Sequence, residues 1–246
     1  MHALLDKELK GTYMVHATFS QDLESSHIYL RVATWEISSF EWLQKEYSFE
    51  DVFSPIIDRI NDQFTLTDVK LQPIIAAYRQ FYWKSLHVDP TKIRPAGEAL
   101  IRRILHKKPI PKISPFVDAY NWASIATCVA MGAYDLNQVK LPLHFRLTQE
   151  NEPFQPIGKP SHTLPPKTLI TSDSANQILC QYPYRDSQFS LIQPKTKTMV
   201  LIAYGISEIS QEILFNALDR TKTHLDWLSA HDIIRYSAGS FEYHEN

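Results

Sequence analysis

The sequence is poor in glycine and cysteine, and these shortages exclude several kinds of site. Only six glycines stand against fifteen prolines in 246 residues. A glycine-rich phosphate loop and a dinucleotide-binding fingerprint both need closely spaced glycines, and neither motif occurs. The two cysteines, Cys128 and Cys180, are too few for a disulfide framework. Both stand in apolar surroundings, so we predict free, buried thiols and a reducing, cytoplasmic location.

Further absences exclude a membrane span and a recognisable metal centre. No run of eighteen apolar residues occurs, and the N-terminus lacks the apolar stretch of a secretory signal. The ten histidines are scattered, without an HExxH motif or a paired Cys/His spacing. A nucleophile elbow and the signatures of an ATP-using synthetase site are also missing. We therefore expect no membrane partner, no metal and no cofactor.

The charge is small overall but unevenly spread along the chain. The net charge of −2 argues against a dedicated nucleic-acid coat protein, and we do not expect DNA as a partner. Residues 1–70 contain six Lys/Arg and twelve Asp/Glu, a balance of −6, whereas residues 71–112 contain nine and two, a balance of +7. The remaining 134 residues contain ten and thirteen, a balance of −3. The basic middle segment is either a footprint for a phosphate backbone or a solvated helical face, and charge alone leaves both open.

Hydrophobic spacing predicts a mixture of helices and strands. Apolar residues recur at helical spacing over 50–62, 73–86, 97–108, 116–130 and 212–228. β-Branched and aromatic runs predict strands over 13–19, 27–35, 143–147, 168–171 and 199–204. We expect the helix of 116–130 to stop at Gly132 and the last ten residues to be frayed. No repeat, low-complexity tract or linker divides the sequence, so the pattern indicates one α+β unit over 1–246.

The segment from Tyr78 to Arg185 carries an ordered series of motifs. Its pieces are Arg79, Asp89-Pro90, Arg94 to Leu100, Arg102-Arg103, Val117-Asp118, Asn121, Gly132 to Asp135, Arg146, and Arg185-Asp186-Ser187. Each piece alone is weak, but their order and spacing together resemble the stand-alone B3/B4 proteins. These proteins are relatives of the editing domain in the beta chain of phenylalanyl-tRNA synthetase. The resemblance is dense over nearly half of the chain and extends more loosely to about residue 230.

The resemblance implies both a fold and a function. The expected fold is a single α+β domain with a β-sandwich-like core of unusual topology flanked by helices. The core is expected to span about 73–230, with an N-terminal extension, 1–72, packed on it. The expected function is that of a trans-acting, editing-type hydrolase that deacylates a mischarged tRNA, so aminoacylated tRNA is the expected partner. The alternatives are a non-catalytic protein that binds tRNA or an amino-acid-like ligand, and an enzyme that acts on a small amino-acid derivative.

The matching motifs also nominate the residues of a substrate pocket. Asn121 matches an asparagine of the synthetase editing pocket, and we predict Asp118 and Asp135 near it as catalytic residues. Each aspartate has a structural alternative, since Asp118 can cap a helix and Asp135 can close a turn. Tyr120 either stacks on a terminal base or packs in the core. The substrate-binding candidates are Arg94, Glu98, Tyr120, Gly132, Arg146 and Arg185. The candidates for contacts with tRNA phosphates, which are otherwise solvated charges, are Arg102, Arg103, Lys107 and Lys108.

The arginines among the substrate-binding candidates have structural alternatives as well. Arg94 precedes a glutamate by four residues at a helix start, so the two side chains can pair as a brace. Arg146 and Arg185 either line the pocket or form buried ion pairs with Asp173 or Asp186. The sequence leaves these alternatives open.

Two positions depart from the synthetase domain. Gly132 stands where that domain carries a histidine, and Ile202 stands where it carries a glutamate that recognises the hydroxyl of tyrosine. A buried carboxylate selects a hydroxyl because an unpaired polar group costs a few kcal/mol, and isoleucine accepts no hydrogen bond. The Ile202 departure disfavours tyrosine as the amino acid that this protein recognises.

Overall fold

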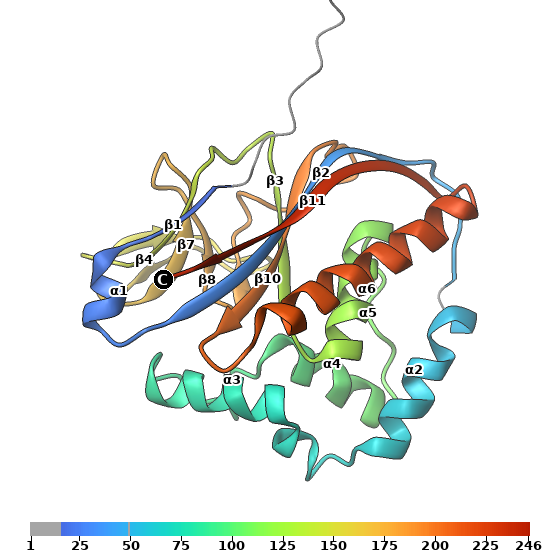
Figure 1. Cartoon of the computed structure of the whole chain (residues 1–246), viewed down its shortest axis with the longest axis horizontal. Coiled ribbons are helices and arrows are strands. Elements are labelled where there is room, and N and C mark those ends of the chain that lie inside the picture. Colours follow the sequence, from blue (N-terminus) through green and yellow to red (C-terminus); the bar gives the residue numbers. More distant parts are fainter. Residues whose placement is uncertain (1–15, 49) are drawn as a thin grey trace, which may run out of the picture.

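The computed structural model describes residues 16–48 and 50–246, and it contains two main sheets and a set of helices (Figure 1). The helices are α1 (Gln21–Ser25), α2 (Glu50–Gln63), α3 (Pro73–Lys84), α4 (Ala96–Leu105), α5 (Pro115–Thr127) and α6 (Gln211–Ala230), with a 3₁₀ turn, η1 (Val69–Leu71). The strands are β1 (Ala17–Phe19), β2 (Leu30–Trp42), β3 (Ala130–Asp135), β4 (Leu143–Leu147), β5 (Glu152–Phe154), β6 (His162–Leu164), β7 (Leu169–Ser172), β8 (Ile178–Gln181), β9 (Arg185–Asp186), β10 (Met199–Ile206) and β11 (Ile234–Glu245).

One sheet has four antiparallel strands in the order β11-β2-β10-β3. β10 reads MVLIAYGI, and all eight residues are buried because the strand has neighbours on both edges and is covered on both faces. α4 and α5 pack against β3, and α6 packs against the other three strands. Figure 1 shows these helices together on one side of the sheet.

The other sheet has five strands in the order β1-β4-β7-β8-β9, and its side chains meet those of the first sheet. Tyr182, which follows β8, lies edge-on to Tyr204 of β10 with ring centres 5.1 Å apart. The Tyr182 ring also contacts Phe145 of β4, and its hydroxyl donates to the carbonyl of Gly205. One continuous hydrophobic core joins both sheets to the helices. The expected single α+β domain, with a sandwich-like core flanked by helices, is confirmed.

Most predicted helices are confirmed, and local sequence explains their ends. α5 begins after Ser114, whose hydroxyl accepts a hydrogen bond from the backbone N–H of Val117, and Pro115 occupies the first turn. α5 ends at Cys128, which has a left-handed backbone with φ of 64°. The expected stop at Gly132 is therefore wrong, because this residue lies inside β3. Cys128 and Cys180 are both free and buried, as predicted.

Both ends of the described chain contribute more to the core than the sequence indicated. Residues 30–42, within the segment expected as a packed extension, form β2, an inner strand between β10 and β11. Residues 234–245 form β11, which pairs with residues 31–42 of β2 apart from register shifts between Ser237 and Phe241, so most of the last ten residues are paired and not frayed. Of the predicted strand 13–19, residues 17–19 form β1, and residues 13–15 lie outside the described residues. Within the described ranges, every helix is too short or too polar to cross a membrane.

Candidate functional site

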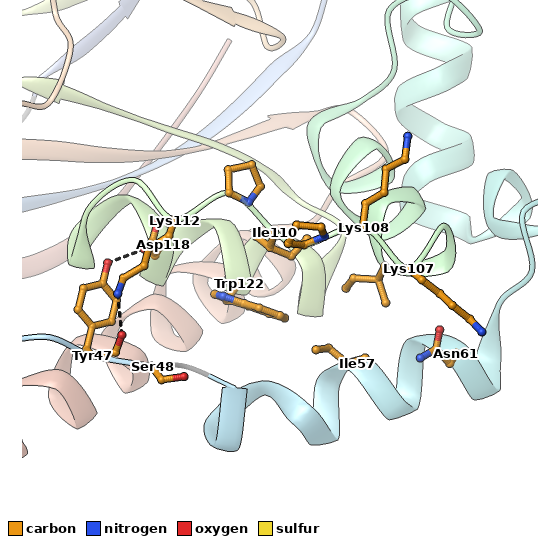
Figure 2. Close-up of a pocket in the computed structure, with 13 residues that line it drawn as sticks. Tyr47, Ser48, Ile57, Asn61, Lys107, Lys108, Ile110, Lys112, Asp118 and Trp122 are labelled. Atoms are coloured by element: carbon orange, nitrogen blue, oxygen red, sulfur yellow. Dashed lines mark hydrogen bonds between the residues drawn. The ribbon is translucent and has the colours of Figure 1, made fainter.

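A cavity of about 860 Å³ opens between α2, α5 and the segment that joins α4 to α5 (Figure 2). Cationic, polar and apolar side chains all contribute to its wall. The cations are Lys107, Lys108 and Lys112; the polar residues are Tyr47, Ser48, Asn61 and Asp118; the others are Ile57, Ile104, Pro109, Ile110, Pro111 and Trp122. The indole of Trp122 stacks on Phe53 of α2, with ring centres 4.2 Å apart, and this stacking joins two walls of the cavity.

Two of the lysines follow directly from the way α4 ends. The backbone N–H of Lys107 donates to the carbonyl of Ile104 at 2.7 Å, and that of Lys108 donates to the carbonyl of Arg103 at 2.8 Å. Lys107 has a left-handed backbone with φ of 55°, so these bonds form a Schellman-type helix end. Figure 2 shows the Lys107 side chain extended toward Asn61 of α2, whereas that of Lys108 points away from the cavity.

The third lysine is held by the segment that follows β2. Lys112 Nζ donates to the carbonyl of Tyr47 at 2.7 Å and lies 4.1 Å from the centre of the Tyr47 ring. The Tyr47 hydroxyl donates to Asp118 Oδ2 at 2.5 Å (Figure 2). Lys112 therefore stands in a fixed position at the cavity, because hydrogen bonding and a cation–π contact both restrict it.

Asp118 lines the cavity but is already committed to structural hydrogen bonds. Besides the Tyr47 hydroxyl on Oδ2, its Oδ1 accepts the backbone N–H of Ile113 at 2.8 Å. Burial raises the pKa of the Asp118 carboxyl above its usual value, and the hydrogen bonds oppose this rise. The carboxylate thus fixes the turn before α5, which is the structural alternative to a catalytic role.

The structure brings only part of the predicted site to the cavity. Asp118, Lys107 and Lys108 line it, but Asn121 does not belong to the lining, although Trp122 does. Asn121 is half-buried on α5. Sequence reasoning missed Tyr47 and Lys112. The +7 segment contains Lys112 and therefore offered a signal for it, whereas nothing near Tyr47 in the acidic first seventy residues singled that residue out.

A second group of predicted residues lies between the two sheets. A Cβ atom at Gly132 would lie 3.0 Å from the ring and hydroxyl of Tyr204 and 3.3 Å from Asp186 Oδ1. Tyr204 thus fills the space that a histidine would need at this position. Its hydroxyl is 2.5 Å from that of Tyr134. Burial raises the pKa of Asp186 to about 6, and the charge of Asp186 helps to raise the pKa of half-buried Tyr120. Tyr120, Gly132 and Asp186 therefore belong to one partly buried polar cluster.

Glu98 has a different partner from the one expected. Its fully buried carboxylate accepts hydrogen bonds from Arg79 Nη1 and Arg102 Nε, whereas Arg94 is exposed before α4. Arg102 also donates to the carbonyl of Leu66. The Arg94–Glu98 brace, one of the two alternatives that the sequence left open for Arg94, is therefore replaced by an ion triad, and the Arg102 guanidinium is directed inward and not toward solvent phosphates.

The remaining predicted side chains also have partners within the protein. Arg103 donates twice to the carbonyl of Pro109 and so braces the cavity wall. Arg146 forms a two-point ion pair with Glu152, with N–O distances of 2.8 and 2.7 Å, and not with the expected aspartates.

Asp135 and Arg185 stand apart from the cavity. Asp135 accepts hydrogen bonds from Asn137 and Thr196, so it closes the turn after β3. Arg185 is half-buried in β9. Burial raises the pKa of the neighbouring Tyr184 to about 12, and the charge of Arg185 opposes this rise. In the described part of the chain, no three His, Cys, Asp or Glu side chains are grouped so as to hold a metal ion.

Comparison with known proteins relates this architecture to one family. The sequence profile described as "B3/4 domain" matches residues 77–222. No protein of curated function matches the sequence. A solved structure, an N-terminal fragment of the phenylalanyl-tRNA synthetase beta-subunit from Pyrococcus horikoshii, is similar with a TM-score of 0.45 and 17% identity, over 87% of this chain and 49% of that one. This chain thus spans about half the length of that structure. Because the family match covers more than half of the sequence, the chain belongs to the B3/4 domain family.

Proposed function

We propose that this protein binds the aminoacylated 3′ end of a tRNA in trans, and that the cavity between α2, α4 and α5 holds that end. Membership of the B3/4 family and the resemblance of its motifs to an editing domain motivate the choice of tRNA. The single observation that carries the proposal is the presence of two cations, Lys107 and Lys112, at one cavity, with Lys112 held in place by Tyr47. An RNA end brings phosphates that match these cations.

The rest of the cavity suits the remainder of such a ligand. Its volume of about 860 Å³ lies within the range of ligand pockets, which is roughly 300–1,000 Å³. Ile57, Ile110 and Trp122 offer apolar contacts for a base or an amino-acid side chain. Asn61 and Ser48 add groups that can donate and accept hydrogen bonds. Phosphates at the lysines would place the sugar and base against this mixed wall.

Tyr47 supports the proposal because it determines where Lys112 can place its charge. The ammonium group of Lys112 is held against the Tyr47 ring and carbonyl, and the Tyr47 ring is held in turn by Asp118. A lysine that is already ordered loses less side-chain entropy when it binds a phosphate. The arrangement therefore favours phosphate binding at this end of the cavity.

Salt dependence gives a direct test of binding. The affinity for an aminoacylated tRNA is measured between about 50 and 200 mM salt for wild type and for the cavity variant Lys107→Ala/Lys112→Ala. The control variant, Lys195→Ala/Lys197→Ala, removes two exposed lysines before β10. Each lost phosphate contact is expected to reduce the slope of log K against log salt by about 0.7, the value for single strands. The cavity variant should lose about 1.4 and the control much less. Equal slopes for the two double variants would refute the cavity as the site.

Deacylation of a mischarged tRNA is the second candidate function, and the resemblance of the motifs to an editing domain favours it. Asp186, whose pKa burial raises to about 6, lies beside Gly132 and outside the cavity, so it can act as the base only for an ester that is bound between the two sheets. An aminoacyl ester is an activated bond, so a positioned water and one base can be sufficient for hydrolysis. Release of free amino acid from a panel of mischarged tRNAs tests this candidate. No release above buffer for any of them would remove hydrolysis and leave the binding proposal standing.

A further inference from the structure

One tryptophan, Trp83 near the end of α3, differs from the others in its exposure. Its side chain is 63% exposed, whereas Trp35 and Trp122 are 1% and 8% exposed and the two remaining tryptophans are half-buried. A single exposed apolar residue is common and needs no explanation by itself. Its surroundings decide whether this indole forms part of a binding surface.

The turn that follows α3 folds back onto the helix. Arg79 and Trp83 are four residues apart and so share one side of α3. The Arg79 guanidinium donates to the carbonyl of Pro90 at 3.2 Å, which fixes the turn beside that side. Within the turn, the backbone N–H of Lys92 bonds to the carbonyl of Asp89 at 3.1 Å. The turn is therefore anchored to α3 at Arg79, one helical turn before Trp83.

The cations of this region are exposed and outnumber its acidic groups. Lys84, Lys92 and Arg94 are all exposed. Asp89 is the only acidic residue between 79 and 97, and its Oδ1 accepts hydrogen bonds from the backbone N–H and the hydroxyl of Thr91 at 2.8 and 2.7 Å. Arg79, by contrast, is engaged with Glu98. The exposed positive charge in the segment that follows Trp83 therefore comes from these three cations, of which Lys92 also acts on Asp89.

We propose that Trp83, Lys84, Lys92 and Arg94, here called the Trp83 surface, form a second contact surface for RNA, in which an unpaired base stacks on the indole and phosphates bind the cations. Charge complementarity identifies the occupant: exposed aromatic rings interleaved with Lys and Arg are typical of proteins that bind single-stranded nucleic acid. A protein partner would need an apolar patch around the indole, whereas the exposed residues that follow Trp83 in the chain, from 84 to 94, are all polar or cationic: Lys84, His87, Thr91, Lys92 and Arg94. The inference rests on the proposed function and extends it beyond the tRNA end.

The tryptophan itself supplies the signal for a test. Intrinsic fluorescence is recorded while wild type, Trp83→Ala and Trp83→Phe are titrated with a tRNA and with an unstructured single-stranded RNA. Trp83→Ala should bind the single strand about fivefold more weakly or worse, which is the lower limit of the usual stacking contribution. Trp83→Phe should keep most of the affinity but lose the part of the quenching that comes from Trp83. The triple variant Lys84→Ala/Lys92→Ala/Arg94→Ala should reduce the salt slope by about 2.

The outcomes separate this inference from the cavity proposal. If Trp83→Ala binds RNA with the affinity and the quenching of wild type, the inference is overturned. It is also overturned if wild type forms a dimer that Trp83→Ala abolishes, because a second copy of the chain would then occupy the surface. If the cavity variant binds normally while the Trp83 variants bind weakly, only the cavity proposal fails. If wild type binds no RNA at all, both fail. Matching thermal melts for the variants, expected because all four residues are exposed, exclude misfolding as the cause.

Discussion

Replacing Glu98 with alanine is expected to destabilise the fold by several kcal/mol. The carboxylate is fully buried and accepts hydrogen bonds from Arg79 Nη1 at 2.9 and 3.1 Å and from Arg102 Nε at 2.8 Å. Both arginine side chains are only 18% exposed. Without Glu98, two mostly buried cations would face each other with carbonyl groups as their remaining partners.

The expected loss of folding free energy depends on the buried groups that each substitution leaves without a partner. Removing one partner of a buried ion pair costs about 3–5 kcal/mol. The lower end applies here, about 3 kcal/mol, because each arginine keeps some solvent contact and one carbonyl acceptor. Glu98→Gln keeps the shape and one acceptor oxygen but weakens charge-assisted hydrogen bonds, so about 1–2 kcal/mol is expected. The two variants should therefore rank in that order.

Urea unfolding followed by circular dichroism measures both effects. With a slope of about 3 kcal/mol per molar urea, Glu98→Ala should lower the midpoint by about 1 M. The control is Glu41→Gln, which removes an exposed partner of Arg235 at 3.6 Å and should cost less than about 1 kcal/mol. If Glu98→Ala costs no more than Glu41→Gln at an unchanged slope, the ion triad does not stabilise the fold as argued.

Three further predictions concern single sites. Burial raises the pKa of Asp186 from 3.8 to about 6, so the native state binds the carboxyl proton more tightly than the unfolded state does, and the free energy of unfolding should fall by up to about 3 kcal/mol as the pH rises from about 4 to about 6. Urea unfolding across this pH range measures the fall, which should be smaller in Asp186→Asn. Gly97→Ala would place a methyl group 2.9 Å from the backbone oxygen of Cys128, so it should lower the free energy of unfolding by about 1–3 kcal/mol despite the better helix propensity of alanine. An unchanged or higher thermal midpoint would contradict this expectation. Tyr47→Phe leaves Asp118 Oδ2 without its 2.5 Å donor and should cost about 1–3 kcal/mol, against which Tyr29→Phe, an exposed tyrosine, should be near neutral.

Local patterns in the sequence were sufficient to predict most helices and the family. The spacing of apolar residues over 73–86 and 212–228 reflects one buried helix face, and a periodic signal of this kind survives without knowledge of the partner. The strand 143–147 was also predicted with the bounds that the structure shows. The ordered motifs between Tyr78 and Arg185 lie within the segment that the family match covers.

Strand pairing and side-chain partners were decided only by tertiary structure. β11 is polar and exposed along much of its length, so its strand character comes from pairing with β2, about two hundred residues away in the chain. The sequence predicted a helix stop at Gly132, whereas in the structure this residue pairs with Ile202 of β10 and belongs to a sheet. Such contacts leave no periodic trace in the local sequence.

The candidate site shows the same division. The sequence by itself determined that a basic segment exists between residues 71 and 112 and that its residues belong to a B3/4-type chain. Folding decided where the cations of that segment lie: Arg79 and Arg102 turn inward to Glu98, whereas Lys107 and Lys112 line the cavity, where Lys112 also lies 3.6 Å from the carboxylate of Glu46. The reason is physical, because a charge is neutralised by whichever partner the fold brings within a few ångströms, and that distance is not encoded in sequence spacing.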